Sequence, residues 1–115
     1  MGGRLGLVGR ARRAPISGGV LMFCVISQWT ATEGLSDELE ETVRSAFVPG
    51  LMALGAVSVH FVETGERSMQ VVTVYPDEET ANAAREKQEA IRAQAVNQMP
   101  VQYVGEARGR VFANG

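Results

Sequence analysis

The stretch ALGAVSVHFVETGERSMQVVTVYPDEETANAA, residues 53–84, decides the fold, because two strands and the start of a helix follow one another within it. The alternation of apolar and polar residues predicts strands over about residues 56–63 and 68–75. The ETGER segment between them offers Gly65 for a turn position with positive φ, so the two strands should form a hairpin. Asp77 and the two glutamates after it should open a helix that runs to about Gln98.

The flanking segments complete the order of elements. Residues 22–31, MFCVISQWTA, are rich in β-branched and aromatic residues and predict a first strand. Ser36 is suited to cap a first helix, which Pro49 should end or kink. A fourth strand is expected over residues 101–112, and the resulting β-α-β-β-α-β order is that of ferredoxin-like domains. We therefore expect an α+β fold in which two helices cover one face of a four-stranded antiparallel sheet.

Periodicity also predicts which side chains share a face in the second half of the chain. The second helix has a stripe of mostly small residues that should lie close to the sheet: Ala81, Ala84, Gln88, Ile91 and Ala95. Its charged residues are expected on the outer, solvated face: Glu86, Lys87, Glu89 and Arg92. In the fourth strand, one face should carry Val101, Tyr103, Gly105 and Ala107, and the other Gln102, Val104, Glu106 and Arg108.

Both faces of the central strands are apolar. The first strand places Phe23, Val25 and Trp29 on one face and Cys24 and Ile26 on the other. Because the two helices cover only one face, the other would expose an apolar patch larger than monomeric proteins usually carry. We therefore expect a homodimer that packs two sheets together, and a sheet of this size can supply the roughly 1,200–2,000 Å² of a standard interface.

The composition is that of one globular domain, with 115 residues of which 45% are hydrophobic. Apolar runs of a few residues fall short of the roughly 20 needed to cross a bilayer, so we expect a soluble protein without a membrane partner. The single cysteine, Cys24, rules out an intrachain disulfide and favours a reducing cytoplasm. No group of residues has the spacing of a metal site.

Residues 1–21 differ from the rest of the chain in charge, because they hold four arginines and no acidic residue. Removing these four charges from the formal net charge of −2 leaves about −6, which opposes nucleic-acid binding by the folded part. We expect a disordered basic tail before a domain over residues 22–115. For residues 1–21 we favour a start codon assigned too far upstream, because Met22 directly precedes the first strand. The alternative is a basic arm that binds an anionic partner. The segment lacks the apolar region of a secretory signal.

The segment MFCVISQWTATEG, residues 22–34, the amphipathic helix after it and the hairpin stretch quoted above together resemble a known family. They are similar to the dimeric α/β barrel superfamily, in particular its antibiotic biosynthesis monooxygenase-like branch, over about residues 22–112. The resemblance implies a barrel built from the sheets of two copies. It also implies oxidation of an aromatic or polyketide-like substrate without a cofactor, although a shared fold does not by itself transfer function.

His60 is the only histidine of the chain and the candidate catalytic base. A general base could take a proton from a phenol or enol, and the resulting electron-rich anion could react with oxygen, as the resemblance to the monooxygenases allows. The competing interpretation is a structural histidine within a strand.

Three large aromatic residues with polar tips, Trp29, Tyr75 and Tyr103, are candidates to line a substrate pocket between sheet and helices. Ser27 and Thr73 could add hydrogen bonds to a bound molecule. The competing interpretation places these residues in the core or in the dimer interface.

Several other functions share this order of elements. A noncatalytic dimeric module that binds a small apolar or aromatic ligand, or only a partner, is the main alternative to the monooxygenase. An RNA-recognition domain is disfavoured by the acidic charge and by SMQVVTVY, residues 68–75, which lacks the aromatic and basic signature. A regulatory amino-acid-binding domain of the ACT type is also disfavoured, because such a domain normally lies beside an enzyme domain and this sequence shows none. The haem-degrading members of the dimeric α/β barrel superfamily use a set of Asn, Trp and His residues. Haem degradation is disfavoured here, because no asparagine falls on an expected strand.

Overall fold

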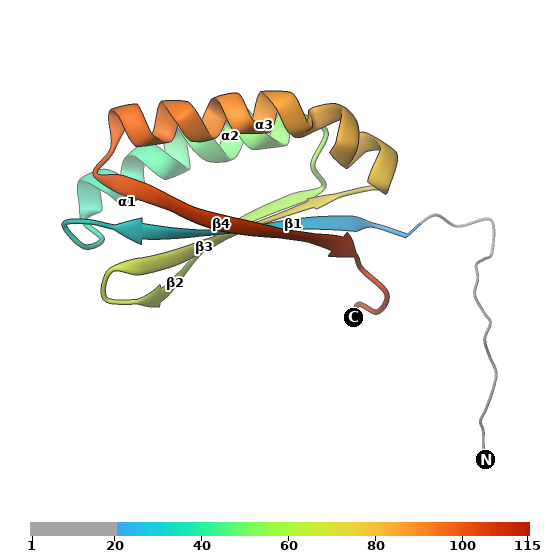
Figure 1. Ribbon diagram of the computed structural model, residues 1–115, viewed down its shortest axis with the longest axis horizontal. Helices are drawn as coiled ribbons and strands as arrows, with labels where there is room; N and C mark the ends of the chain where they lie inside the picture. Colours follow the sequence, from blue (N-terminus) through green and yellow to red (C-terminus); the bar gives the residue numbers. More distant parts are fainter. Residues whose placement is uncertain (1–20) are drawn as a thin grey trace, which may run out of the picture.

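The computed structural model describes residues 21–115, so the expectations for the basic tail fall on residues that lie outside the described part, apart from Leu21. A four-stranded antiparallel sheet in the order β2-β3-β1-β4 carries its helices on one face (Figure 1). This confirms the expected α+β fold of the ferredoxin-like type. No helix within the described range is both long and apolar enough to span a membrane.

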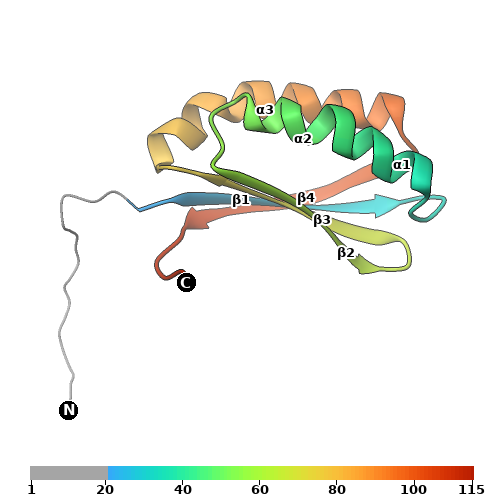
Figure 2. The same ribbon diagram turned by 180° about the vertical axis from the view of Figure 1, so that it is seen from behind.

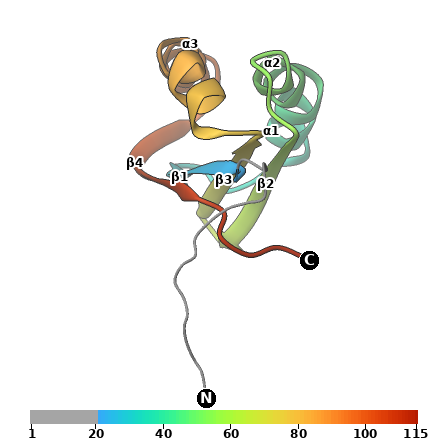
Figure 3. The same ribbon diagram turned by 90° about the vertical axis from the view of Figure 1, so that its right-hand side faces the viewer.

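The strands lie close to their expected positions. Their bounds are β1 Phe23–Ala31, β2 Ser58–Gly65, β3 Ser68–Tyr75 and β4 Val101–Arg110. The first helical region consists of α1 Asp37–Thr42, a π-helical segment η1 Val43–Phe47 and α2 Val48–Met52, and the second is α3 Glu78–Gln98. Seen along the sheet, the two helical regions lie side by side above it (Figure 3).

Both helical regions begin with the side-chain caps that the sequence predicts. The Ser36 hydroxyl accepts a hydrogen bond from the backbone N–H of Leu39 at 3.1 Å. The Asp77 carboxylate accepts one from the backbone N–H of Thr80 at 2.7 Å. Hydrogen bonds from the side chain and the backbone of Thr80 hold the pKa of Asp77 below its ordinary value.

Of the two outcomes that the sequence allowed at Pro49, an end or a kink, the helical region does not end there but continues to Met52. In the π-helical segment the backbone N–H of Val48 bonds to the carbonyl oxygen of Val43, five residues back. The wider turn places Pro49 in the first turn of α2, where a missing N–H is tolerated. The same segment carries Phe47, which is buried beneath the helix.

The faces of β4 also differ from the expectation. The pairing of β1 with β4 joins Trp29 to Tyr103 but Gln28 to Gly105, so Val104 is an extra residue in a bulge. Past the bulge the alternation is inverted, and the face that carries Tyr103 continues with Glu106 and Arg108 rather than with Gly105 and Ala107. Charged side chains of β4 therefore lie under the helices.

The core occupies the space between the sheet and the helices. Val25, Trp29, Val71 and Tyr75 are buried on the inner face, and the small-residue stripe of α3 is buried against them, with Ile91 partly exposed. The outer face carries Cys24, Ile26, Val72 and Val74, all partly exposed. No helix of the described residues covers this open face, and the segment after β4 turns toward that side (Figure 2).

Candidate functional site

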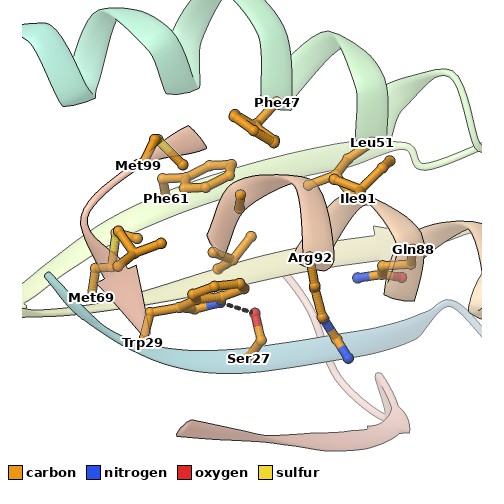
Figure 4. Close-up of a pocket in the computed structure, with 13 residues that line it drawn as sticks. Ser27, Trp29, Phe47, Leu51, Phe61, Met69, Gln88, Ile91, Arg92 and Met99 are labelled. Carbon is orange, nitrogen blue, oxygen red and sulfur yellow. Dashed lines mark hydrogen bonds between the residues drawn. The ribbon is translucent and has the colours of Figure 1, made fainter. Parts of the chain in front are cut away.

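A small cavity lies between the two helical regions and the inner face of the sheet, and thirteen residues line it (Figure 4). Its volume is about 30 Å³, which is room for one or two water molecules. The walls are mostly apolar, with Phe47 and Leu51 from the first helical region and Phe61 and Met69 from the hairpin. Three polar residues, Ser27, Gln88 and Arg92, complete the lining.

Trp29 and Ser27 form the floor of the cavity and both come from β1. They are two residues apart, so they share the inner face of the strand. The indole Nε1–H of Trp29 donates a hydrogen bond to the Ser27 hydroxyl at 2.8 Å, and both side chains are buried. Tyr103 meets Trp29 edge to face, with 5.3 Å between the ring centroids. The Trp29 indole ring is therefore held on two sides.

Gln88 enters the cavity from α3 and is held from behind by Tyr75. The Tyr75 hydroxyl donates a hydrogen bond to Gln88 Oε1 at 2.8 Å, and both residues are buried. Burial raises the pKa of Tyr75, and the charges of Arg108 and Arg92 oppose this rise. Because its oxygen is already paired, the Gln88 amide keeps its two N–H donors for other partners.

Arg92 extends from α3 over the sheet and is largely buried, with 11% of its side chain exposed. It donates to the Glu106 carboxylate at 2.9 Å and lies 4.9 Å from the centroid of the Tyr103 ring. The expectation that Arg92 only solvates the outer face of the helix was therefore wrong. Sequence periodicity missed this contact because the bulge in β4 turns Glu106 toward the helix.

Glu106 is the shared partner of three arginines. Its carboxylate is 2.9 Å from Arg92, 3.8 Å from Arg85 and 3.9 Å from Arg108. Burial alone raises the pKa of Glu106, but the hydrogen bond from Arg92 and the three positive charges outweigh it, so the pKa lies below its ordinary value. Arg108 also donates to Asn82 on α3 at 3.0 Å.

His60 lies on the opposite side of the sheet. It pairs with Val72 of β3, and its side chain is exposed on the open face. Residues 59 and 61 on either side of it point toward the helices, and Phe61 lines the cavity. The structure therefore does not bring His60 together with Trp29 or Tyr75.

Of the other expected site residues, two line the cavity and three lie outside it. Ser27 and Trp29 line it, whereas Tyr75 and Tyr103 stand behind Gln88 and Trp29. Thr73 is fully buried, and its hydroxyl has no hydrogen-bond partner among the described residues. Gln88 and Arg92 are the polar lining residues that the sequence did not single out as a site.

A wider surface groove of about 340 Å³ runs between the first helical region and β2. Its walls include Leu39, Val43 and Val62, with Glu40 and Glu63 among its polar residues. Its polar side chains are exposed: Arg44 lies 3.8 Å from Glu40 and hydrogen-bonds to Glu41, and all three are open to solvent, whereas Ser27 and Gln88 in the inner cavity are buried. We therefore place the candidate site in the inner cavity.

Comparison with known proteins supports the fold. No family model matches the sequence, and no curated protein matches it. The structure is similar to the crystal structure of the NE2512 protein of unknown function from Nitrosomonas europaea, with a TM-score of 0.60 and 18% sequence identity. The match covers 85% of this chain and 96% of the other. At this identity the likeness concerns the fold and not the function.

Proposed function

We propose that this protein binds a small apolar or aromatic molecule in the cavity between its helices and its sheet. The observation that carries the proposal is the cavity lining, in which aromatic and aliphatic side chains form almost the whole surface, with Ser27, Gln88 and Arg92 at its edge. A mostly apolar pocket with a few well-held polar groups is the usual form of a small-molecule site. The buried partners of Ser27 and Gln88 hold these groups in place before a ligand arrives.

A ring-sized ligand needs more than the 30 Å³ of the unliganded cavity, so its walls must move on binding. Met69 and Met99 line the cavity, and unbranched thioether side chains change rotamer easily. Ile91 and Phe61 also line it and are partly exposed, so they can shift outward without leaving the core. We propose that the ligand enters between the two helical regions by displacing these side chains.

We also propose that two copies associate through their open sheet faces, as in the dimeric α/β barrel superfamily. Support comes from the cross-strand pair of Ile26 and Val72 and the pair of Cys24 and Val74, which give this face an apolar centre. Val72→Lys would place a charge there without touching the inner core, and light scattering should then find a monomer. Gln94→Lys on the exposed side of α3 should stay dimeric, and a monomeric unmutated protein would contradict the proposal.

The proposal is for binding, and it leaves oxidation as a prediction from the family resemblance. His60 is exposed on the open face, so it could act only on a substrate held at that face or between two copies. The cavity itself fits the noncatalytic ligand-binding module equally well. We also propose a cytoplasmic location, as expected for a chain whose single cysteine allows no intrachain disulfide.

Trp29 offers a direct test, because it is the only tryptophan of the chain and lines the cavity. Titration with benzyl alcohol should change its fluorescence in a saturable way if the ring enters the cavity. The proposal is contradicted if neither benzyl alcohol nor benzoate changes the Trp29 emission or protects the protein against thermal unfolding.

Matched variants on α3 localise the binding. Ala95 is buried and lines the cavity, so Ala95→Val should fill part of it and remove most of the fluorescence change. Ala93→Val makes the same substitution at an exposed position of the same helix and should leave the titration unchanged. If both variants bind alike, the ligand lies elsewhere.

A further inference from the structure

We infer that the open sheet face pairs with the same face of a second copy only while His60 is uncharged, so that protonation of His60 separates the two copies. The inference rests on the dimer proposed above and adds its regulation. It starts from the composition of the open face, which no helix of the described residues covers (Figure 2).

The open face carries no charged residue on the two central strands. Cross-strand partners share a face of a sheet, so the pairing register shows which residues lie together. The central strands contribute Cys24, Ile26 and Gln28 from β1 and Gln70, Val72 and Val74 from β3.

The two edge strands continue this neutral surface. The partners of the central residues are Ser58, His60 and Val62 in β2 and Gly105, Ala107 and Gly109 in β4. In a chain with 21% charged residues, about two or three of these twelve positions would be charged at random, and none is Asp, Glu, Lys or Arg. A sheet face that stays in water normally carries such charges. A second copy presents the same neutral surface, so two copies can pair face to face without burying a charge.

His60 lies beside the apolar centre of this face. It pairs with Val72, which pairs with Ile26 on the next strand. Neighbouring strands lie about 4.8 Å apart, so about 10 Å separates His60 from Ile26. A second copy that covers Ile26 and Val72 therefore covers His60 as well.

The elements around His60 do not face it with a charged side chain. From β3 and β1 it meets only the neutral residues named above. Glu63, the acidic residue of β2, lies on the inner face opposite Met69, and Glu66 and Arg67 lie in the turn beyond the strand ends.

Two further titratable groups belong to this side of the sheet. Burial raises the pKa of the Cys24 thiol, so this group stays uncharged near neutral pH. The segment after β4, residues 111–115, has no charged side chain and ends in the Gly115 carboxylate. Replacement of His60 separates its effect from those of both groups.

Protonation of His60 costs little in one copy and much more in the dimer. The side chain is exposed in a single copy, so water can solvate the imidazolium. In the dimer it would lie against a neutral face, and two-fold symmetry would bring a second imidazolium into the same interface. A buried charge without a partner is unfavourable, so protons bind the separated copies more tightly than the dimer. Because histidine changes its charge between about pH 5 and 8, acidification within this range should favour the monomer.

Sedimentation equilibrium of the full chain at about pH 8 and about pH 5.5 tests the inference. The dissociation constant of the dimer should be about tenfold to hundredfold higher at the lower pH, since up to two protons bind as each dimer separates. His60→Gln stays neutral at both pH values, and its dissociation constant should change by less than about twofold. Circular dichroism at both pH values checks that the monomer remains folded.

A matched pair of variants adds a histidine at two exposed glutamines. Gln28→His adds it to the open face and should make the dissociation constant depend more steeply on pH. Gln94→His adds it to the exposed side of α3 and should leave the pH dependence as in the unmutated protein.

The outcomes separate this inference from the proposed dimer. Equal dissociation constants at both pH values, or an unchanged pH dependence in His60→Gln, would overturn the role of His60 and leave the dimer intact. A full chain that is monomeric at both pH values would overturn the dimer itself and the inference with it.

Discussion

The hydrogen bond between Tyr75 and Gln88 supports both the core and the cavity, and Tyr75→Phe tests it. The donor hydroxyl is fully buried and Gln88 is 4% exposed, so the variant leaves Gln88 Oε1 without its partner in the interior. An unpaired buried acceptor costs about 1–3 kcal/mol. For a domain of this size each kcal/mol lowers the midpoint of thermal unfolding by about 4–8 °C, so a loss of about 4–24 °C is expected.

A double-mutant cycle with Gln88→Met, followed by urea unfolding monitored by circular dichroism, measures the pair itself. Gln88→Met alone leaves the buried Tyr75 hydroxyl without its acceptor and should lower the free energy of unfolding by a similar amount. The double variant replaces both polar groups by apolar ones and should recover to within about 1 kcal/mol of the unmutated protein. Additive losses, or a Tyr75→Phe loss below about 0.5 kcal/mol, would refute the reasoning.

Three further predictions concern the backbone, the charges and the thiol. Gly55 has φ +103°, and an added Cβ would lie 3.2 Å from Thr80 Cγ2, so Gly55→Ala should lower the free energy of unfolding by about 1–2 kcal/mol. Gly109→Ala, which meets open space, should not lower it in urea unfolding. Because the folded pKa of Glu106 lies below its ordinary value of 4.5, its contribution to stability is present above that pH and is lost as the pH falls through the folded pKa. Unfolding midpoints of Glu106→Gln should therefore depend less on pH than those of the unmutated protein as the pH falls below 4.5, and an unchanged dependence would contradict the ion-pair account. Burial raises the pKa of Cys24, so iodoacetamide should alkylate it more slowly at neutral pH than it alkylates free cysteine, and an equal rate would contradict this.

Most of the fold could be predicted because its signals are local. Hydrophobic alternation located β3 to the residue, and the caps at Ser36 and Asp77 set the starts of both helical regions. The backbone path through the middle of the first region could not be predicted in the same way. A proline normally breaks a helix, and the π-helical turn before Pro49 is a compensation that residue types do not reveal.

The candidate site was predicted less well, because its contacts are made between distant segments. Ser27 and Trp29 follow from strand alternation, so the sequence located the floor of the cavity. The contact of Arg92 with Glu106 depends on a bulge at Val104, and a single extra residue inverts every side chain after it. The same alternation places His60 on the face of the sheet opposite the cavity. The sequence did not show which face His60 would occupy, because apolar residues lie on both sides of the strand.

The most direct test of the central claim is a crystal structure of the protein with 4-bromobenzoate, with the bromine located by its anomalous scattering. The account predicts bromine inside the cavity, among the apolar side chains near Leu51 and Phe61. Bromine only on the open sheet face or in the groove beside β2, with the cavity closed as in the unliganded protein, would contradict it.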